Sequence, residues 1–391
     1  MSRLDFSRRE NALSRAISSR RAPFIDLTLA NPTAVGLPYE EERILQALAN
    51  PLALRYQPQP RGQPEARAAV AKYAGADPES IILSASTSEA YSWLFKLLCD
   101  AGDEVLVPQP SYPLFEVLAA LESVRLVPYE LRWDGEWHLD AAALRFSART
   151  RAVLVVSPGN PTGAYLKKDE RAALAQACAR HGCALICDEV FADYPAFPDA
   201  RRVRSAADFD DVLSFSLSGL SKVAGLPQLK LGWCIASGPG ATEALRRLEL
   251  IADTWLSVGT PVQLAAAELL ETRHGIQRAL NSLLALNRAA LLQARGPSAP
   301  WDLLRCEGGW SAILSVPRWR SEEGWALLLL EAGVLVHPGY FFDFASGAFL
   351  VVSLLQEPAV FARGAEILAA VLEREQAEGG EDEEEPSGDP P

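Results

Sequence analysis

The sequence predicts an α/β protein with a mostly parallel sheet and a second, smaller α+β domain. Short apolar runs alternate with longer Ala- and Leu-rich segments of helical period, which is the pattern of βα units around a parallel sheet. Polar residues follow several of these runs, and the pattern changes from about residue 291 onward. The first two observations indicate the large domain, and the change indicates the smaller one.

Each expected strand is an apolar run bounded by polar or turn residues, and each expected helix carries Ala and Leu at helical spacing. Representative strands expected in the large domain are Glu104–Val107, Ala152–Ser157, Ala184–Cys187, Val212–Ser216 and Gly232–Ala236. The helices expected between them include Ser88–Cys99, Lys168–Arg180 and Thr242–Ile251. Residues 308–316 and 349–354 are expected to be strands of the smaller sheet.

The chain divides into four segments by composition. Residues 46–285 carry the rhythm of the large domain, and residues 286–372 form the small domain. Composition leaves open which domain the Pro-rich residues 1–45 pack on, and we assign them to the small domain. Residues 373–391 are acidic, Pro- and Gly-containing and free of aromatic or β-branched residues, so we expect a disordered tail.

Composition also restricts the function classes. A chain of 391 residues that is 49% hydrophobic can bury at least one large core. With 37 Lys and Arg against 50 Asp and Glu, a net charge of −13 disfavours a nucleic-acid partner. The apolar stretches fall short of the roughly 20 residues of a membrane helix, and the charged N-terminus lacks the apolar run of a secretory signal, so we expect a cytoplasmic protein.

The six cysteines are too few and too irregularly spaced for a disulfide framework. Cys178, Cys183 and Cys187 lack the Cys-x-x-Cys spacing of a zinc site. We therefore expect small buried apolar side chains and no metal site.

Three polar side chains follow expected strands at their carboxyl ends. Asn160, Asp188 and Lys222 are separated by 28 and 34 residues (160 to 188 and 188 to 222). Taken one at a time, Asn160 is explained as a turn amide, Asp188 as a helix cap and Lys222 as a surface charge. If consecutive βα units stack side by side, however, the three converge on one crevice. Together they suit a pyridine aldehyde: lysine for a Schiff base, carboxylate for the ring nitrogen and amide for the ring hydroxyl.

The segment 219–232, Gly-Leu-Ser-Lys-Val-Ala-Gly-Leu-Pro-Gln-Leu-Lys-Leu-Gly, resembles the lysine signature of the class I/II aminotransferases. These are fold type I enzymes that use pyridoxal 5′-phosphate (PLP), and the resemblance extends over nearly the whole chain up to the acidic tail. It implies a large domain with a mostly parallel, seven-stranded sheet sandwiched by helices. It also implies PLP as cofactor and a homodimer with shared active sites.

The resemblance assigns roles to matching residues. Lys222 would form the Schiff base with PLP and then carry the proton between the substrate and the cofactor. Asp188 would keep the pyridine nitrogen protonated, and Asn160, in an Asn-Pro-Thr-Gly motif, would donate to the ring oxygen O3′. Tyr112, in Pro-Ser-Tyr-Pro, would stack on the pyridine, although a tyrosine packed in a turn is the structural alternative.

The phosphate is expected at a serine-rich helix start. Ser86, Thr87 and Ser88 match the phosphate loop of the family, with a simple helix cap as the alternative. Tyr56 resembles the tyrosine that reaches the phosphate held by the neighbouring subunit. Lys230 stands where the family has an arginine that pairs with the phosphate, and it offers a point charge in place of a planar fork.

Three further positions depart from the family. Gly219 replaces a serine, for which Ser218 could compensate, and Phe191 replaces the tyrosine that donates to O3′. Val351 stands where the family has the arginine that binds the substrate α-carboxylate.

Three explanations of Val351 are open. Arg318 or Arg320 could reach the pocket, the substrate could lack an α-carboxylate, or the alignment of this strand could be displaced. A surface position for both arginines is the plainer expectation. His337 could line the pocket, with a histidine satisfied in a turn as the alternative.

The leading hypothesis is an aminotransferase that moves an amino group from an amino acid or related amine to a 2-oxo acid by a ping-pong mechanism. One alternative is a PLP-dependent lyase, decarboxylase or amine-specific enzyme on the same scaffold, which the missing arginine favours. Another is a non-catalytic PLP-binding module, against which the intact Lys222 and Asp188 argue.

Overall fold

The large sheet is the centre of the fold. In the computed structural model, which describes residues 10–380, its strands lie in the order β2-β9-β8-β7-β6-β3-β4-β5. Strands β3, β4, β6, β7 and β8 run parallel, whereas β9 and β5 are antiparallel to their neighbours. The bounds are β2 (Ile81–Ser84), β3 (Glu104–Gln109), β4 (Arg125–Trp133), β5 (Trp137–Leu139), β6 (Thr150–Val156), β7 (Ala184–Asp188), β8 (Ser214–Gly219) and β9 (Gly232–Ser237).

The sheet is mostly parallel, as the sequence predicts, but it has eight strands within the described residues where seven are expected. The additional edge strand is β5, which forms a hairpin with the far end of β4. Trp133 pairs with Trp137 across a short reversal, and their rings lie 5.2 Å apart. The strand has only three residues, too few to show the alternation by which strands are recognised.

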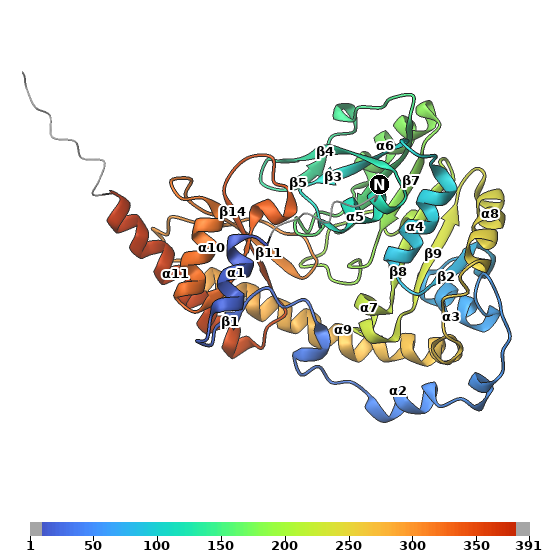
Figure 1. Ribbon diagram of the computed structural model, residues 1–391, viewed down its shortest axis with the longest axis horizontal. Coiled ribbons are helices and arrows are strands. Elements are labelled where there is room, and N and C mark those ends of the chain that lie inside the picture. The colour runs from blue at the N-terminus through green and yellow to red at the C-terminus, as the bar shows by residue number, and fades with distance from the viewer. Residues whose placement is uncertain (1–9, 381–391) are drawn as a thin grey trace, which may run out of the picture.

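Helices cover both faces of this sheet (Figure 1). Helices α4 (Thr87–Leu98), α5 (Leu114–Leu121) and α8 (Ala241–Asp253) cover one face. Helices α3 (Pro64–Ala74), α6 (Lys168–His181), α7 (Leu220–Val223) and the first part of α9 (Thr260–Ala294) cover the other. Successive strand residues alternate between the two cores: Ala184 and Ile186 pack on the first face, Leu185 and Cys187 on the second. Because both faces are buried, the strands read as continuous apolar runs.

The small domain is built on a four-stranded sheet in the order β10-β11-β14-β13. Its strands are β10 (Asp302–Leu303), β11 (Ser311–Ser315), β13 (His337–Pro338) and β14 (Phe349–Ser353). The helices around it are α1 (Ala12–Ser19), α10 (Glu322–Glu331) and α11 (Pro358–Gly380). The 35-residue helix α9 runs from beneath the large sheet into this domain, so it joins the two bodies (Figure 1).

The first described residues divide between the two domains. Strand β1 (Ile25–Asp26) pairs in parallel with β12 (Val334–Leu335), and α1 packs on α10. Helix α2 (Glu41–Leu48) packs instead on helix α9, which also contacts α3. The remaining short 3₁₀ segments are η1 (Pro32–Ala34), η2 (Pro51–Leu54), η3 (Pro78–Ser80), η4 (Ala141–Ala143), η5 (Ala206–Asp208), η6 (Pro227–Leu229) and η7 (Gly339–Phe342).

The C-terminal part of the chain is ordered further than its composition predicts. Helix α11 continues to Gly380, past residue 373 where we expect the tail to begin, because Leu368, Val371 and Leu372 anchor it in the small-domain core. The rest of the expected tail, residues 381–391, lies outside the described residues. Between residues 10 and 380, every helix is too short or too polar to cross a bilayer.

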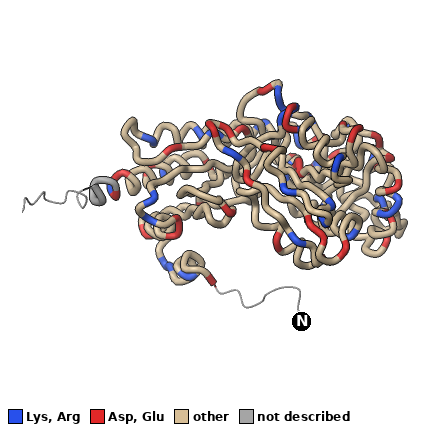
Figure 2. Tube along the Cα trace, turned by 90° about the horizontal axis from the view of Figure 1, so that it is seen from above, with Lys and Arg blue, Asp and Glu red and all other residues tan. Residues whose placement is uncertain are grey.

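Charged residues of both signs recur along the described chain. Figure 2 shows Lys and Arg interspersed with Asp and Glu along the trace. Five of the six cysteines are buried, and Cys99 is partly buried.

One buried ion pair joins the two domains. Lys167, at the start of α6, lies with its Nζ 2.9 Å from the carboxylate of Glu307, which precedes β11. The same carboxylate accepts a hydrogen bond from the backbone N–H of Tyr165 at 3.0 Å. Both charged side chains are removed from solvent, so each depends on the other for compensation.

We predict that Lys167→Met destabilises the protein by about 3–5 kcal/mol, because it leaves the Glu307 carboxylate buried without its cation. Urea unfolding followed by circular dichroism measures the change. The double variant Lys167→Met/Glu307→Gln is the control, and it should recover part of the loss since no uncompensated charge remains. Equal losses in the single and double variants would contradict this account.

Candidate functional site

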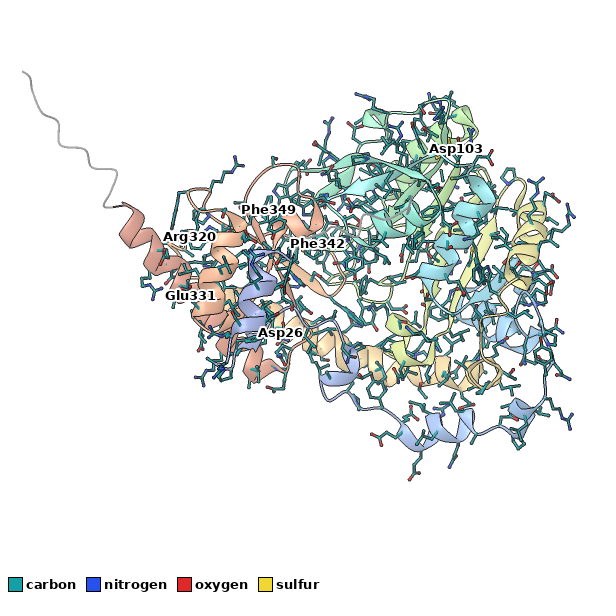
Figure 3. The ribbon with its side chains drawn as sticks, viewed as in Figure 1. Asp26, Asp103, Arg320, Glu331, Phe342 and Phe349 are labelled. Atoms are coloured by element: carbon teal, nitrogen blue, oxygen red, sulfur yellow. The ribbon has the colours of Figure 1, made fainter. Side chains whose placement is uncertain are left out.

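The largest described cavity lies where the carboxyl ends of β6, β7 and β8 face the small domain. It has a volume of about 500 Å³ and receives side chains from both domains. Figure 3 labels Phe342, which lines it at the junction of the two domains. The predicted site residues that line it are Ser86, Thr87, Ser88, Tyr112, Asn160, Asp188, Lys222 and Lys230.

Asp188 is the last residue of β7 and is buried at the floor of the cavity. Its Oδ2 accepts a hydrogen bond from the hydroxyl of Tyr91 at 2.8 Å, and its Oδ1 accepts one from the backbone N–H of Val190 at 3.1 Å. Burial raises the pKa of Asp188, while the two hydrogen bonds and the nearby Lys222 charge oppose the rise. Sequence analysis missed Tyr91, which lies on the buried face of α4 and reads as a core residue.

Lys222 lies in the short helix α7, directly after β8. Because β7 and β8 are parallel, with Asp188 opposite Leu217, their following residues reach the same edge of the sheet. The Nζ of Lys222 is 4.9 Å from the ring centre of Trp310 and 5.6 Å from that of Phe191. Burial lowers the pKa of Lys222, and the Asp188 charge works in the opposite direction. The Tyr194 hydroxyl donates to the backbone carbonyl of Lys222 and so fixes this turn.

Asn160 lies in the loop that follows β6 and contacts the small domain. Its Oδ1 accepts a hydrogen bond from the Ser311 hydroxyl of β11 at 3.2 Å. That contact leaves the amide nitrogen of Asn160 as the group available to donate into the cavity.

The phosphate candidates lie at the N-terminus of α4. The Ser86 hydroxyl caps this helix by accepting from the backbone N–H of Glu89 at 3.2 Å, and Ser86 also lines the cavity. Thr87 and Ser88 also line the cavity. Lys230 lies beside this helix start, since β9 begins two residues later with Gly232 opposite Ser84.

Tyr112 and Tyr56 are placed differently. Tyr112 lines the cavity just before α5, and the backbone N–H of its neighbour Ser111 donates to the Phe342 carbonyl at 2.9 Å. Tyr56 is 83% exposed and lines a separate hollow with Leu256 and Gly259. Within one chain, therefore, the structure does not bring Tyr56 to the cavity.

The departures from the family pattern lie at the cavity itself. Gly219, Phe191 and Val351 all line it. A Cβ on Gly219 would lie 3.0 Å from the Leu231 carbonyl oxygen, so this close approach explains the glycine. Ser218, which we considered as a replacement hydroxyl, is not among the described lining residues, whereas Ser221, missed by sequence analysis, is.

Of the explanations considered for Val351, the one in which Arg318 or Arg320 reaches the pocket finds no support among the cavity-lining residues. Arg320 pairs with Glu375 at 2.5 Å and lies over the ring of Trp325, on the outer part of the small domain (Figure 3). Neither arginine lines the described cavity. His337 does line it, opposite Val351 in the sheet, and burial lowers the pKa of its imidazole against the opposing charge of Asp26.

This chain is similar to a family model and to several known aminotransferases. Residues 26–356 match the family model for aminotransferase class I and II. The chain is 27% identical over 277 residues to the glutamate-pyruvate aminotransferase AlaA of Haemophilus influenzae, covering 68% of this chain and 66% of that protein. It is 32% identical over 274 residues to the probable N-succinyldiaminopimelate aminotransferase DapC of Mycobacterium tuberculosis, covering 66% and 67%.

The fold comparison agrees. An aspartate aminotransferase variant of Thermus thermophilus superposes with a TM-score of 0.81 at 24% identity, covering 95% of this chain and all of that one. The matched region spans about two thirds of the curated relatives, 66% of the Haemophilus protein and 63% of the Escherichia coli AlaA. The chain belongs to the aminotransferase class I and II family.

Proposed function

We propose that this protein is a PLP-dependent aminotransferase that moves an amino group from an amino acid or related amine to a 2-oxo acid. The observation that carries the proposal is that Lys222 and Asp188 line one cavity at the carboxyl edge of the parallel strands. Family membership supports the same reaction, because it joins this geometry to the family's lysine signature.

The chemistry of the lining side chains fits PLP. When bound, PLP supplies an aldehyde that condenses with amines and a pyridine ring that accepts electrons. Thr87, Ser88 and Lys230 would hold the phosphate at the N-terminus of α4, where the helix dipole favours an anion. The Asn160 amide nitrogen would donate to the ring oxygen, and Tyr112 would stack on the ring.

Lys222 is suited to covalent attachment and to proton transfer. Both tasks need a neutral amine, and the lowered pKa of Lys222 increases the neutral fraction. The aromatic rings of Trp310 and Phe191 flank its Nζ and limit the positions that this nitrogen can take. From there Nζ can accept the proton that leaves the amine-bearing carbon of the donor.

Asp188 is suited to hold a proton on the ring nitrogen. A buried carboxylate would tend to become neutral, but Tyr91 and Val190 both donate to it and favour the ionised form. Burial and the Asp188 charge raise the pKa of Tyr91, so its hydroxyl keeps the proton that it donates.

The proposed working unit is a homodimer in which Tyr56 contacts the cofactor phosphate of the other subunit. Tyr56 is 83% exposed, and its near neighbour in the chain Leu54 is 92% exposed; Trp255, which precedes the hollow residue Leu256, is 57% exposed. Leu256 lines the same hollow as Tyr56, together with polar side chains that include Gln57, Gln59 and Gln263. Such a surface is typical of a protein–protein contact.

We predict that Lys222→Ala, purified with PLP, loses both the visible absorbance of the lysine-linked imine and all amino transfer, because Lys230, the other lysine that lines the cavity among residues 10–380, lies beside the helix start proposed for the phosphate. Absorption spectroscopy and an assay of the 2-oxo acid product measure the two effects. Lys72→Ala is the matched control, since Lys72 is exposed and pairs with Glu271. Normal turnover in the Lys222 variant would refute the assignment.

We predict that Tyr91→Phe shifts the acid limb of the kcat–pH profile to higher pH. Loss of the phenol removes a donor to the ionised form, so the pKa of Asp188 rises and activity fails earlier as pH falls. One hydrogen bond to a charged group is worth about 1.5–3 kcal/mol, or roughly one to two pH units. Tyr73→Phe is the control, because its hydroxyl bonds Asp193 instead. An identical shift in both variants would contradict the role of Tyr91.

We predict a dimer in sedimentation equilibrium, at twice the chain mass of 42.4 kDa. Tyr56→Phe should keep that mass but weaken PLP binding by about threefold to tenfold, because one hydrogen bond to the phosphate is lost. Equilibrium dialysis measures the affinity, and Tyr340→Phe serves as the exposed-tyrosine control. A monomer, or unchanged affinity in the Tyr56 variant, would count against shared sites.

A further inference from the structure

The two domains give the cavity walls of different character. The large domain contributes hydroxyls, the Asp188 carboxylate and two lysines, beside apolar side chains such as Phe115, Val190 and Phe191. The small domain contributes what we call the small-domain wall: Trp310, Ser311, His337, Phe342, Val351 and Ser353. Phe342 and Val351 pack in one apolar cluster, and Trp310 meets Phe191 of the large domain edge to face at 5.2 Å.

The cationic side chains that line the cavity within residues 10–380 are Lys222 and Lys230, and both belong to the large domain. Lys222 is committed to the reacting carbon, and Lys230 lies beside the helix start that would hold the phosphate. His337 stands on the small-domain wall, but its burial favours the neutral imidazole. The wall therefore offers no formal positive charge from the described residues.

The hydroxyl donors near the wall are already engaged. Ser311 donates to Asn160 at 3.2 Å, and Ser353 donates to the backbone carbonyl of Leu29 at 2.5 Å. Thr28, which also lines the cavity, donates its hydroxyl proton to Asp26 at 2.6 Å. A carboxylate placed against this wall would lose its hydration and gain no cation. The donors left to it are uncharged, namely the indole N–H of Trp310, which has no partner among the described residues, and the amide of Asn160, so its burial there is unfavourable.

From this geometry we infer that the preferred amino donor is a primary amine whose amine-bearing carbon carries an apolar substituent and no carboxylate. The inference rests on the proposed function, since it concerns the same cavity. Apolar and aromatic substituents gain from contact with Trp310, Phe342 and Val351, whereas a carboxylate does not.

The first half-reaction balances without a further reagent. The donor's C–N bond is exchanged for a C=O bond, so its carbon is oxidised to an aldehyde or ketone. The nitrogen passes to the aldehyde carbon of PLP, which is thereby reduced to an amine, and no net water is consumed. Lys222 Nζ carries the proton that leaves the donor carbon. An oxo acceptor reverses the same exchange in the second half-reaction.

The first test compares matched donors on the PLP-loaded protein. The pairs are 2-phenylethylamine with L-phenylalanine and 3-methylbutylamine with L-leucine, which differ only by the carboxylate. We expect each amine to bleach the cofactor absorbance and to yield its aldehyde, with a half-saturating concentration at least about tenfold below that of its amino acid. Amino acids that match or exceed the amines would overturn the inference and leave the aminotransferase assignment intact.

A second measurement does not depend on turnover. Calorimetric titration with 2-phenylethanol and 3-phenylpropanoate compares a neutral and an anionic ligand that carry no amine. We expect 2-phenylethanol to bind and 3-phenylpropanoate to bind at least about tenfold more weakly. Tighter binding of the anion would overturn the inference. Absence of bleaching by every amine and amino acid would instead contradict the proposed function, and the donor assignment with it.

A charge-restoring variant tests the wall directly. Val351→Arg should lower the half-saturating concentration of L-phenylalanine by about tenfold and raise that of 2-phenylethylamine, because it places a cation on the wall. Val351→Met is the matched control, of similar length but uncharged, and should leave the amine preferred. Circular dichroism checks that both variants fold. If the arginine variant folds and the preference is unchanged, the carboxylate is recognised elsewhere and the inference fails; if it does not fold, the donor pairs on the native protein decide.

Discussion

The parallel alignment of β6, β7 and β8 is the constraint on which the site depends. Leu185 pairs with Val153 on one side and Ser214 on the other, so the three strands end at one edge of the sheet. Asn160, Asp188 and Lys222 follow those ends, and this alignment brings residues far apart in the chain to one cavity. Burial on both faces holds this alignment, because a shift by one residue would exchange the two cores.

Much of this arrangement could be predicted from the sequence. Long apolar runs gave the five central strands within a few residues, and the spacing of Asn160, Asp188 and Lys222 predicted that they meet. Both inferences use information that is local in the chain or periodic along it. Sequence analysis did not predict the short strand β5 or the extension of α11 to Gly380. Packing against distant residues determines both features, and composition does not.

The residues that sequence analysis missed share a physical cause. Tyr91 hydrogen-bonds Asp188 across 97 positions, and on α4 it is indistinguishable from the neighbouring core residues Leu94 and Phe95. Trp310 likewise reads as part of a buried strand region, yet its ring lies over the Nζ of Lys222. The sequence shows that a tyrosine or tryptophan carries a polar group on an aromatic ring. Only the tertiary fold determines which residue that group contacts.

The departures from the family pattern on the large domain differ in chemical character from the departure on the small domain. On the large domain, Lys230 keeps a positive charge, Gly219 is imposed by the nearby Leu231 carbonyl, and Phe191 keeps an aromatic ring beside Lys222. On the small domain, Val351 removes a charge altogether. In this fold, the residues that would hold the cofactor and the residues that would select the substrate lie on different walls of the cavity. Family membership therefore constrains the cofactor residues more tightly than the substrate residues.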